Sequence, residues 1–275
     1  FLRNHDELTL EMVTDKERDY LWDTYASDKR ARINMGIRRR LAPLMQNDRR
    51  KIELLNSLLM SMPGTPILYY GDEIGMGDNI WLPDRDASRT PMQWTPDRNA
   101  GFSTADPGKL FLPVVQSLVY NYTLVNVESQ LAQSRSLLHW VRNVIHVRKQ
   151  HPTFGLGSMR VLRTDHESVL AFVREYEGSG SQFGDAPERV LCVFSFAHNP
   201  VAVNIEIGEE FAGQPLYDLF GGAEFPRVAE DGTATLVARG AGSGAGTSAQ
   251  TADIRPMARQ LSPGGTGQGY RRRTL

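Results

Sequence analysis

DRRKIELLNSLLMSMPGTPILYYGDEIG is the sequence of residues 48–75, and it contains the alternation of elements that decides the fold. Apolar residues recur at helical spacing over residues 52–62, and Asp48 before them is a typical N-cap. The Pro-Gly pair at 63–64 ends this helix. Residues 67–70 then predict a short buried strand, which a polar loop follows. Helix, loop, strand and polar loop in this order are typical of an α/β barrel.

After this barrel-like unit the sequence first loses its periodic pattern, up to residue 126, and then regains a helical one. Residues 75–126 have little periodic pattern, and a loop of this length is usually functional or disordered. Four large aromatic side chains argue against disorder: Trp81, Trp94, Phe102 and Phe111. Residues 128–150 predict a helix with apolar residues on one face, and Pro152 lies just beyond its end.

From about residue 158 the apolar period changes from helical spacing to two. Strands are predicted over residues 169–176, 189–196 and 201–207. We therefore expect a small antiparallel β-domain, a sandwich, at residues 158–239. Residues 240–275 are rich in Gly, Ser, Ala and Thr, and this composition predicts a disordered tail.

The bulk composition excludes several classes of protein. The chain has 275 residues, 40% of them hydrophobic, and a formal net charge of −1, which does not suggest a nucleic-acid-binding surface. No apolar run reaches the length of a membrane span. The single cysteine, Cys192, lies in an apolar run and is expected to be a buried packing thiol. Without a signal peptide or a cysteine pair we expect a cytoplasmic protein, and Phe1 to Asp6 resemble the middle of a longer chain.

Three groups of polar residues are candidates for chemistry. Asn4-His5-Asp6 follows a predicted strand end, where it could bind sugar hydroxyls, a metal or a proton, or form a structural loop. Residues 84–94 place two Asp and two Arg beside Trp94, which suits either a polar pocket or a solvated salt-bridge cluster. Glu7 and Glu11 share one face if their segment is helical, although two exposed like charges are usually just solvated.

Taken in order, several motifs resemble the α-amylase superfamily, glycoside hydrolase family 13. They are Asn4-His5-Asp6, Pro63-Gly64-Thr65-Pro66, residues 69–75, Arg89-Thr90-Pro91-Met92-Gln93-Trp94 and Asn99-Ala100-Gly101-Phe102. Three further runs are similar to the trehalose synthase branch of that superfamily: residues 37–44, 70–80 and 122–130. The resemblance extends from residue 1 to about residue 228.

The resemblance implies a fold and a set of site residues. Residues 1–157 would form the C-terminal part of a (β/α)8 barrel, from strand seven onward, ahead of the antiparallel β-domain. Asp6 would be the carboxylate that holds two hydroxyls of the bound glucose in the transition state, with His5 assisting it. Arg85 would close the sugar pocket, and Glu7 and Glu11 would line the second sugar site or its gate. The charged segment 14–36 would be part of a lid, or else a solvated linker helix.

The resemblance also implies a reaction, the interconversion of maltose and trehalose by a retaining glucosyl transfer. The family's nucleophile and general acid lie on earlier strands, and no segment here resembles them, so this chain alone is expected to be inactive. The alternatives are an α-glucosidase and a non-catalytic fragment or assembly module. No metal or other cofactor is expected in this chain, with calcium placed in an N-terminal part outside it. Expected partners are maltose or trehalose and a second copy or a maltokinase, with no nucleic acid or membrane.

Overall fold

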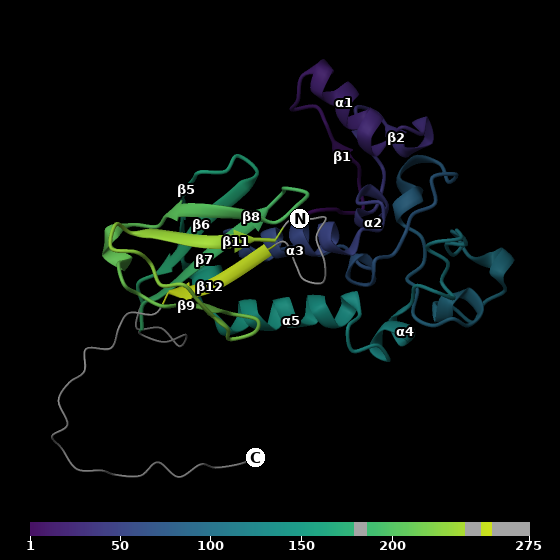
Figure 1. Ribbon diagram of the computed structural model, residues 1–275. Coiled ribbons are helices and arrows are strands. Elements are labelled where there is room, and N and C mark those ends of the chain that lie inside the picture. The colour runs from purple at the N-terminus through teal and green to yellow at the C-terminus, as the bar shows by residue number, and fades with distance from the viewer. Residues whose placement is uncertain (179–185, 240–248, 255–275) are drawn as a thin grey trace, which may run out of the picture.

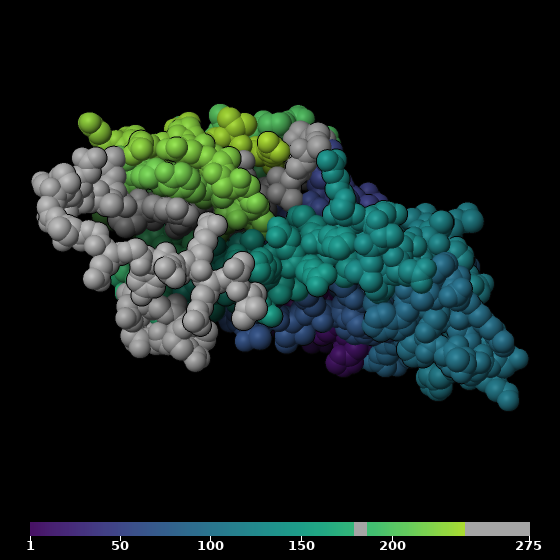
Figure 2. All heavy atoms as spheres, turned by 90° about the horizontal axis from the view of Figure 1, so that it is seen from below, coloured from purple at the N-terminus to yellow at the C-terminus, as the bar shows by residue number. Residues whose placement is uncertain are grey.

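The computed structural model describes residues 1–178, 186–239 and 249–254, and these form two parts joined by two helices (Figure 1). The N-terminal part is mostly irregular, and the C-terminal part is a β-sandwich. The two connecting helices, α3 (Arg49–Ser61) and α5 (Leu137–Gln150), lie between the parts. Seen from below, the segment with α4 (Val127–Leu131) and α5 lies at the surface between the sandwich and the loops (Figure 2).

The first forty residues form a small lobe built on a short antiparallel sheet. Its strands pair in the order β1-β3-β2. The helix α1 begins at a complete capping box, in which Thr14 and Glu17 satisfy each other's backbone N–H groups. The elements of the lobe are β1 (Leu8–Thr9), α1 (Asp15–Tyr25), the 3-10 turn Lys29–Ala31, β2 (Arg32–Ile33) and β3 (Gly36–Ile37), and α2 (Leu41–Leu44) follows them.

The helix predicted after residue 48 is confirmed, with the Asp48 side chain accepting from the N–H groups of Arg50 and Lys51. Its two sides pack differently. Ile52 and Leu55 face an apolar cluster shared with α5, whereas Leu54 and Leu58 face the sandwich. The helix α3 therefore contacts both parts of the chain.

The single helix predicted over residues 128–150 is wrong, because the structure divides it into α4 and α5. Asn126 caps α4 by accepting from the N–H of Ser129, and Ser136 caps α5 by accepting from the N–H of His139. Two capped starts within ten residues favour two helices over a continuous one. The irregular region before them contains only 3-10 turns among its regular elements: Asp72–Ile74, Asp84–Ser88, Arg98–Gly101 and Pro107–Lys109.

The predicted strands of an α/β barrel are not formed at residues 1–6 or 67–70. Neither segment pairs with a strand, Ile67 is 58% exposed, and residues 66–68 make no backbone hydrogen bond within the described chain. Every strand pair in the described residues is antiparallel. A parallel strand depends on neighbours on its two sides, and here no described segment supplies them.

The C-terminal part is a sandwich of two antiparallel sheets. One has six strands in the order β10-β9-β12-β7-β6-β4, and the other has three in the order β11-β8-β5. The strand predictions for residues 169–176, 189–196 and 201–207 are confirmed within one residue. The strands are β4 (Ser158–Val161), β5 (Arg163–Thr164), β6 (Val169–Tyr176), β7 (Glu188–Ser195), β8 (Val201–Glu206), β9 (Leu216–Asp218), β10 (Glu224–Phe225), β11 (Thr233–Ala238) and β12 (Ala249–Ile254).

The disordered tail expected from residue 240 is wrong over residues 249–254, which form β12 between β7 and β9. Five residue pairs join it to β7 and three join it to β9. The composition misled because a central strand is held by backbone hydrogen bonds on both edges, and these do not depend on a strongly apolar sequence. The rest of the expected tail lies outside the described residues.

A second apolar cluster joins the sandwich to the helices. Phe172 and Phe194, on adjacent strands, stack with ring centroids 5.5 Å apart, and Leu54 of α3 and Phe154 of α6 (Thr153–Leu156) pack beside them. Cys192 is fully buried in this cluster, as predicted, and burial raises the pKa of its thiol to about 12. In the described part of the chain, no helix is long and apolar enough to cross a membrane.

Candidate functional site

The loop that contains Asp6 is shaped by its own side chains and by a buried arginine. The Asp6 N–H donates to Asn4 Oδ1 at 2.9 Å, and the Glu7 N–H donates to Asp6 Oδ1 at 2.8 Å. Arg3, only 2% exposed, donates to the carbonyls of Asp6, Ile37 and Arg39. The Asn4-His5-Asp6 loop is thus fixed to the segment that follows β3.

Arg85 stands at the centre of three carboxylates. Its guanidinium lies 2.6 Å from Asp6 Oδ1, 2.7 Å from Glu7 Oε2 and 2.8 Å from Asp84 Oδ1. The Arg85 hydrogen bond and the Glu7 backbone N–H lower the pKa of Asp6 to about 2. The hydrogen bonds that Arg85 donates, first to Asp6 and second to Asp84, raise the pKa of Arg85. The site therefore holds an ionised Asp6 against a fixed positive charge.

The structure brings together three of the five predicted site residues. Asp6, Glu7 and Arg85 form one cluster, although Arg85 is 79 positions from Asp6. His5 is next to them, but its side chain is exposed and only its carbonyl is held, by Arg89 Nε at 2.8 Å.

Glu11 does not join this cluster. Residues 7–11 are not helical, since they contain β1 and a turn, so the face expected for Glu7 and Glu11 does not exist. Glu11 is exposed, and no hydrogen bond or ion pair of its carboxylate is found among the described residues. Asn34, which the sequence reasoning missed, donates to Glu7, and Asp84, from the candidate segment 84–94, contacts Arg85.

A buried ionic cluster beneath the site was also missed. Arg40 is fully buried against the rings of Tyr69 and Tyr70, and its guanidinium carbon lies 4.6 Å from the centroid of each ring. It donates to the Tyr70 carbonyl at 2.6 Å and lies 3.4 Å from Asp72 Oδ1. Burial raises the pKa of Asp72 to about 6, against the opposing effect of the two arginines, Arg40 and Arg3. A run of three arginines usually indicates a solvated face, and nothing in the sequence alone marks Arg40 as buried.

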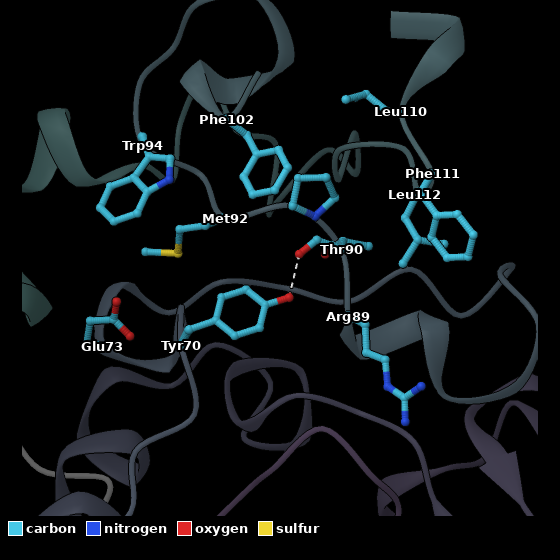
Figure 3. A pocket seen from close by; sticks show the side chains of 11 residues that line it. Tyr70, Glu73, Arg89, Thr90, Met92, Trp94, Phe102, Leu110, Phe111 and Leu112 are labelled. Atoms are coloured by element: carbon cyan, nitrogen blue, oxygen red, sulfur yellow. Dashed lines mark hydrogen bonds between the residues drawn. The ribbon is translucent and has the colours of Figure 1, made fainter. Parts of the chain in front are cut away.

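An apolar cavity of about 550 Å³ opens beside this site (Figure 3). Tyr70 crosses its floor and donates its hydroxyl to the Thr90 carbonyl at 2.6 Å. Trp94 and Phe102 line one side, both about half exposed. A second cavity, of about 360 Å³, continues past Tyr70 and Glu73 toward α5. Residues 68–70 therefore lie beside open apolar cavities.

The chemistry available to the cluster is that of hydroxyl binding. An ionised carboxylate accepts hydrogen bonds from sugar hydroxyls, and such bonds strengthen when an oxocarbenium-like transition state makes the hydroxyls more acidic. A metal is not expected from these side chains, because no group of three or more His, Cys, Asp and Glu residues in the described regions could hold one.

Two protein families match the chain, one on each part. The pattern for the α-amylase catalytic domain matches residues 33–157, and the pattern for the maltogenic amylase C-terminal domain matches residues 159–242.

Individual relatives give a closer comparison. The chain is 56% identical to the trehalose synthase of Pimelobacter and 54% identical to the trehalose synthase/amylase TreS of Mycolicibacterium smegmatis, each over 84% of this chain and 39% of the relative. Thus it spans about two fifths of the length of these curated relatives. Among solved structures, the trehalulose synthase MutB of Pseudomonas mesoacidophila aligns with a TM-score of 0.53 at 22% identity, over 79% of this chain and 41% of that one.

Proposed function

Because the chain belongs to the α-amylase superfamily, with trehalose synthases among its relatives, we propose that it carries part of a glucosyl-transfer site that interconverts maltose and trehalose. The proposed reaction is a retaining transfer within one bound disaccharide. The observation that supports this most directly is the contact of Asp6 with Arg85 at 2.6 Å.

The role proposed for Asp6 is to accept hydrogen bonds from two hydroxyls of the glucose ring. Arg85 keeps this carboxylate ionised, so it is ready to accept them over a wide pH range. These bonds strengthen as the ring flattens and gains positive charge, which lowers the barrier rather than tightening ground-state binding. Half of the Asp6 side chain is open to solvent, so a sugar can reach it.

Arg85 is proposed to close the inner end of the sugar pocket. Its three ion pairs leave its guanidinium little freedom, so it forms a fixed wall that accepts one terminal glucose. Glu7, which is paired with both Arg85 and Asn34, is proposed to face the second sugar, the one that turns over before it is attacked again. His5 and Glu11, both exposed, are assigned to the rim of the site.

The nucleophile and the general acid are proposed to come from a segment outside this chain, like the part of the relatives that this chain does not span. Such a segment would lie on the open apolar surface around Tyr70, where residues 66–68 have unused backbone groups. A retaining mechanism requires two carboxyl groups about 5–5.5 Å apart, and the proposal places both on that segment. The proposed reaction requires no cofactor from this chain, and a calcium site is proposed only for the segment outside this chain.

The test is a chimera in which this chain replaces the homologous segment of the Pimelobacter trehalose synthase. With maltose as substrate we expect trehalose as the main product, and Asp6→Asn in the same chimera is the matched control for loss of activity. Adding isotopically labelled free glucose tests whether the transfer stays within one disaccharide, since a closed site incorporates no label.

Two results would count against the proposal. Glucose as the sole product would establish an α-glucosidase, the alternative that the same carboxylate and arginine would serve. A folded chimera with no turnover of maltose, beside an active parent enzyme, would leave the chain with a binding or assembly role.

A further inference from the structure

Arg38, which follows β3, gathers four backbone carbonyls around its guanidinium. Its Nη1 donates to the carbonyls of Leu82 at 2.7 Å and Asp84 at 2.5 Å, and its Nη2 donates to that of Ile80 at 3.2 Å. Its Nε donates to the carbonyl of Arg30 at 2.7 Å. Three of these four acceptors lie within the five residues that precede Arg85.

Residues 80–83 of the loop held in this way belong to no helix or strand. Three carbonyls that converge within five residues repel one another unless a cation lies between them. Asp84 also has a φ of 47°, a left-handed conformation that a non-glycine residue adopts at a cost of about 1 kcal/mol or more. Arg38 donates to the carbonyl of this same residue, so it stabilises the loop where the backbone is most strained.

The direction of Arg85 depends on this strained residue, because Asp84 is its neighbour in the chain and opens the 3-10 turn Asp84–Ser88. A change at Asp84 would turn Arg85 away from Asp6 and Glu7, which it now contacts at 2.6 and 2.7 Å.

The carboxylate side of the ion-pair cluster is fixed to the hairpin β2–β3, which Arg38 directly follows. Leu8, directly after Glu7, pairs with Ile37, directly before Arg38, in the β1–β3 ladder. Asn34, in the turn of the hairpin, donates to Glu7 at 3.0 Å. The hairpin β2–β3 therefore holds the carboxylates through its strand and the arginine through Arg38.

We propose that Arg38 is a positioning residue, which aims Arg85 at Asp6 by clamping the carbonyls of residues 80–84. It would touch no substrate and act only through the backbone of this loop. The inference rests on the proposed function for its importance to catalysis, but the arrangement that it describes can be measured without any turnover.

The experiment is a carbon-13 titration of the Asp6 carboxyl in the full 275-residue chain. In the unaltered chain the Asp6 pKa is expected at about 2, and in the reference variant Arg85→Ala it should rise toward 3.8, the ordinary value. Arg38→Ala is expected to raise it in the same direction, since Arg85 is no longer aimed at Asp6. Arg38→Lys keeps the charge but reaches fewer carbonyls, so a smaller rise is expected.

Arg30→Ala is the matched control. The Arg30 side chain stacks on Trp81 at 3.6 Å, so it joins the same lobe to the same loop, but its carbonyl remains available to Arg38. The Asp6 pKa should stay at about 2 in this variant. A rise equal to that of Arg38→Ala would overturn the carbonyl clamp, because general attachment of the lobe would then explain both.

An unchanged Asp6 pKa in a folded Arg38→Ala chain would also overturn the proposal. If Arg38→Ala unfolds the lobe, as seen in its amide spectrum, Arg38→Lys alone decides the test. An unchanged Asp6 pKa in the Arg38→Lys chain would then overturn the proposal. The proposed function can fail separately. A chimera that is inactive on maltose would not change the result of these titrations. An active chimera, in turn, does not require that replacing Arg38 raises the pKa of Asp6.

Discussion

Arg174, in the middle of β6, donates its Nη1 to the carbonyl of Ser61, the last residue of α3, at 2.6 Å. The guanidinium also donates to Gly157 at 2.7 Å and to Ser158 at 2.9 Å, and the residue is 1% exposed. One buried side chain thus satisfies three carbonyls, at the end of α3, after α6 and at the start of β4. It is the polar counterpart of the apolar contact between Leu54 and the sandwich.

Replacing Arg174 should therefore destabilise the whole chain. Arg174→Met retains much of the apolar stem but leaves three carbonyls without their donor, one of them that of the buried Ser61, and we expect a loss of about 3 kcal/mol in the free energy of unfolding. Urea unfolding followed by circular dichroism measures it. Arg163→Met, at an exposed position of β5, is the control and should change stability by less than about 0.5 kcal/mol. Equal effects of the two changes would contradict the role given to Arg174.

Asp72 should make stability depend on pH. Burial raises its pKa in the folded chain to about 6, above its ordinary value of 3.8, so the folded state binds the proton more tightly than the unfolded state. Its contribution to stability is complete below pH 3.8 and is lost as the pH rises through about 6. Asp72→Asn has no such proton, so the variant should gain stability relative to the unaltered chain between pH 4 and pH 8.

The measurement is the difference in unfolding free energy between the two chains across that range of pH. A difference that moves the other way would mean that Arg40, 3.4 Å from Asp72, and Arg3 outweigh burial and keep the carboxylate ionised.

Because β12 pairs with two other strands, the stability of the sandwich should depend sharply on where the chain is truncated. A chain truncated after Arg239 removes the strand that pairs with both β7 and β9, and their inner backbone groups lose their partners. A chain truncated after Arg255 keeps β12. We expect the shorter chain to be less stable by several kcal/mol, because each unsatisfied buried group costs about 1–3 kcal/mol. Thermal unfolding compares them, and equal midpoints would show that β12 contributes nothing to the sheet.

The elements that were predicted correctly are those whose own residues determine them. The strands β6, β7 and β8 carry apolar residues at most of their buried positions, and α3 has both a cap and an apolar stripe. The family assignment from ordered motifs is confirmed as well. Residues 67–70 have an equally apolar pattern but no strand, because pairing depends on neighbours that the local sequence does not contain.

The site shows the same division between local and distant information. Its motif residues could be recognised in the sequence, and Asp6, Glu7 and Arg85 do lie together. What could not be predicted is the support: Arg38 and Arg40 occur in one basic run, yet one clamps a loop and the other is buried against two tyrosines. Only their contacts across 30 to 46 positions of chain distinguish them.

In the active chimera, Asp6→Asn should affect the chemical step more than binding. The amide keeps the shape of the side chain but removes the negative charge that accepts from the sugar hydroxyls in the transition state. Because those bonds strengthen only as the ring gains positive charge, kcat and kcat/KM should fall together, by about 100-fold or more, with little change in KM. Steady-state rates with maltose measure both constants.

Glu7→Gln is the matched comparison, because it removes the neighbouring charge that Arg85 also contacts. Glu7 is proposed to face the sugar that must turn over and return, so this change should cost less in kcat and should raise the share of free glucose among the products.

The low pKa of Asp6, about 2, adds a further constraint: its carboxylate stays ionised as the pH falls, so the activity of the unaltered chimera should not decline through titration of Asp6 until the pH approaches that value. If Asp6→Asn retained most of its activity, Asn4-His5-Asp6 would be a structural loop, and the ion pair with Arg85 would serve only to hold it in place.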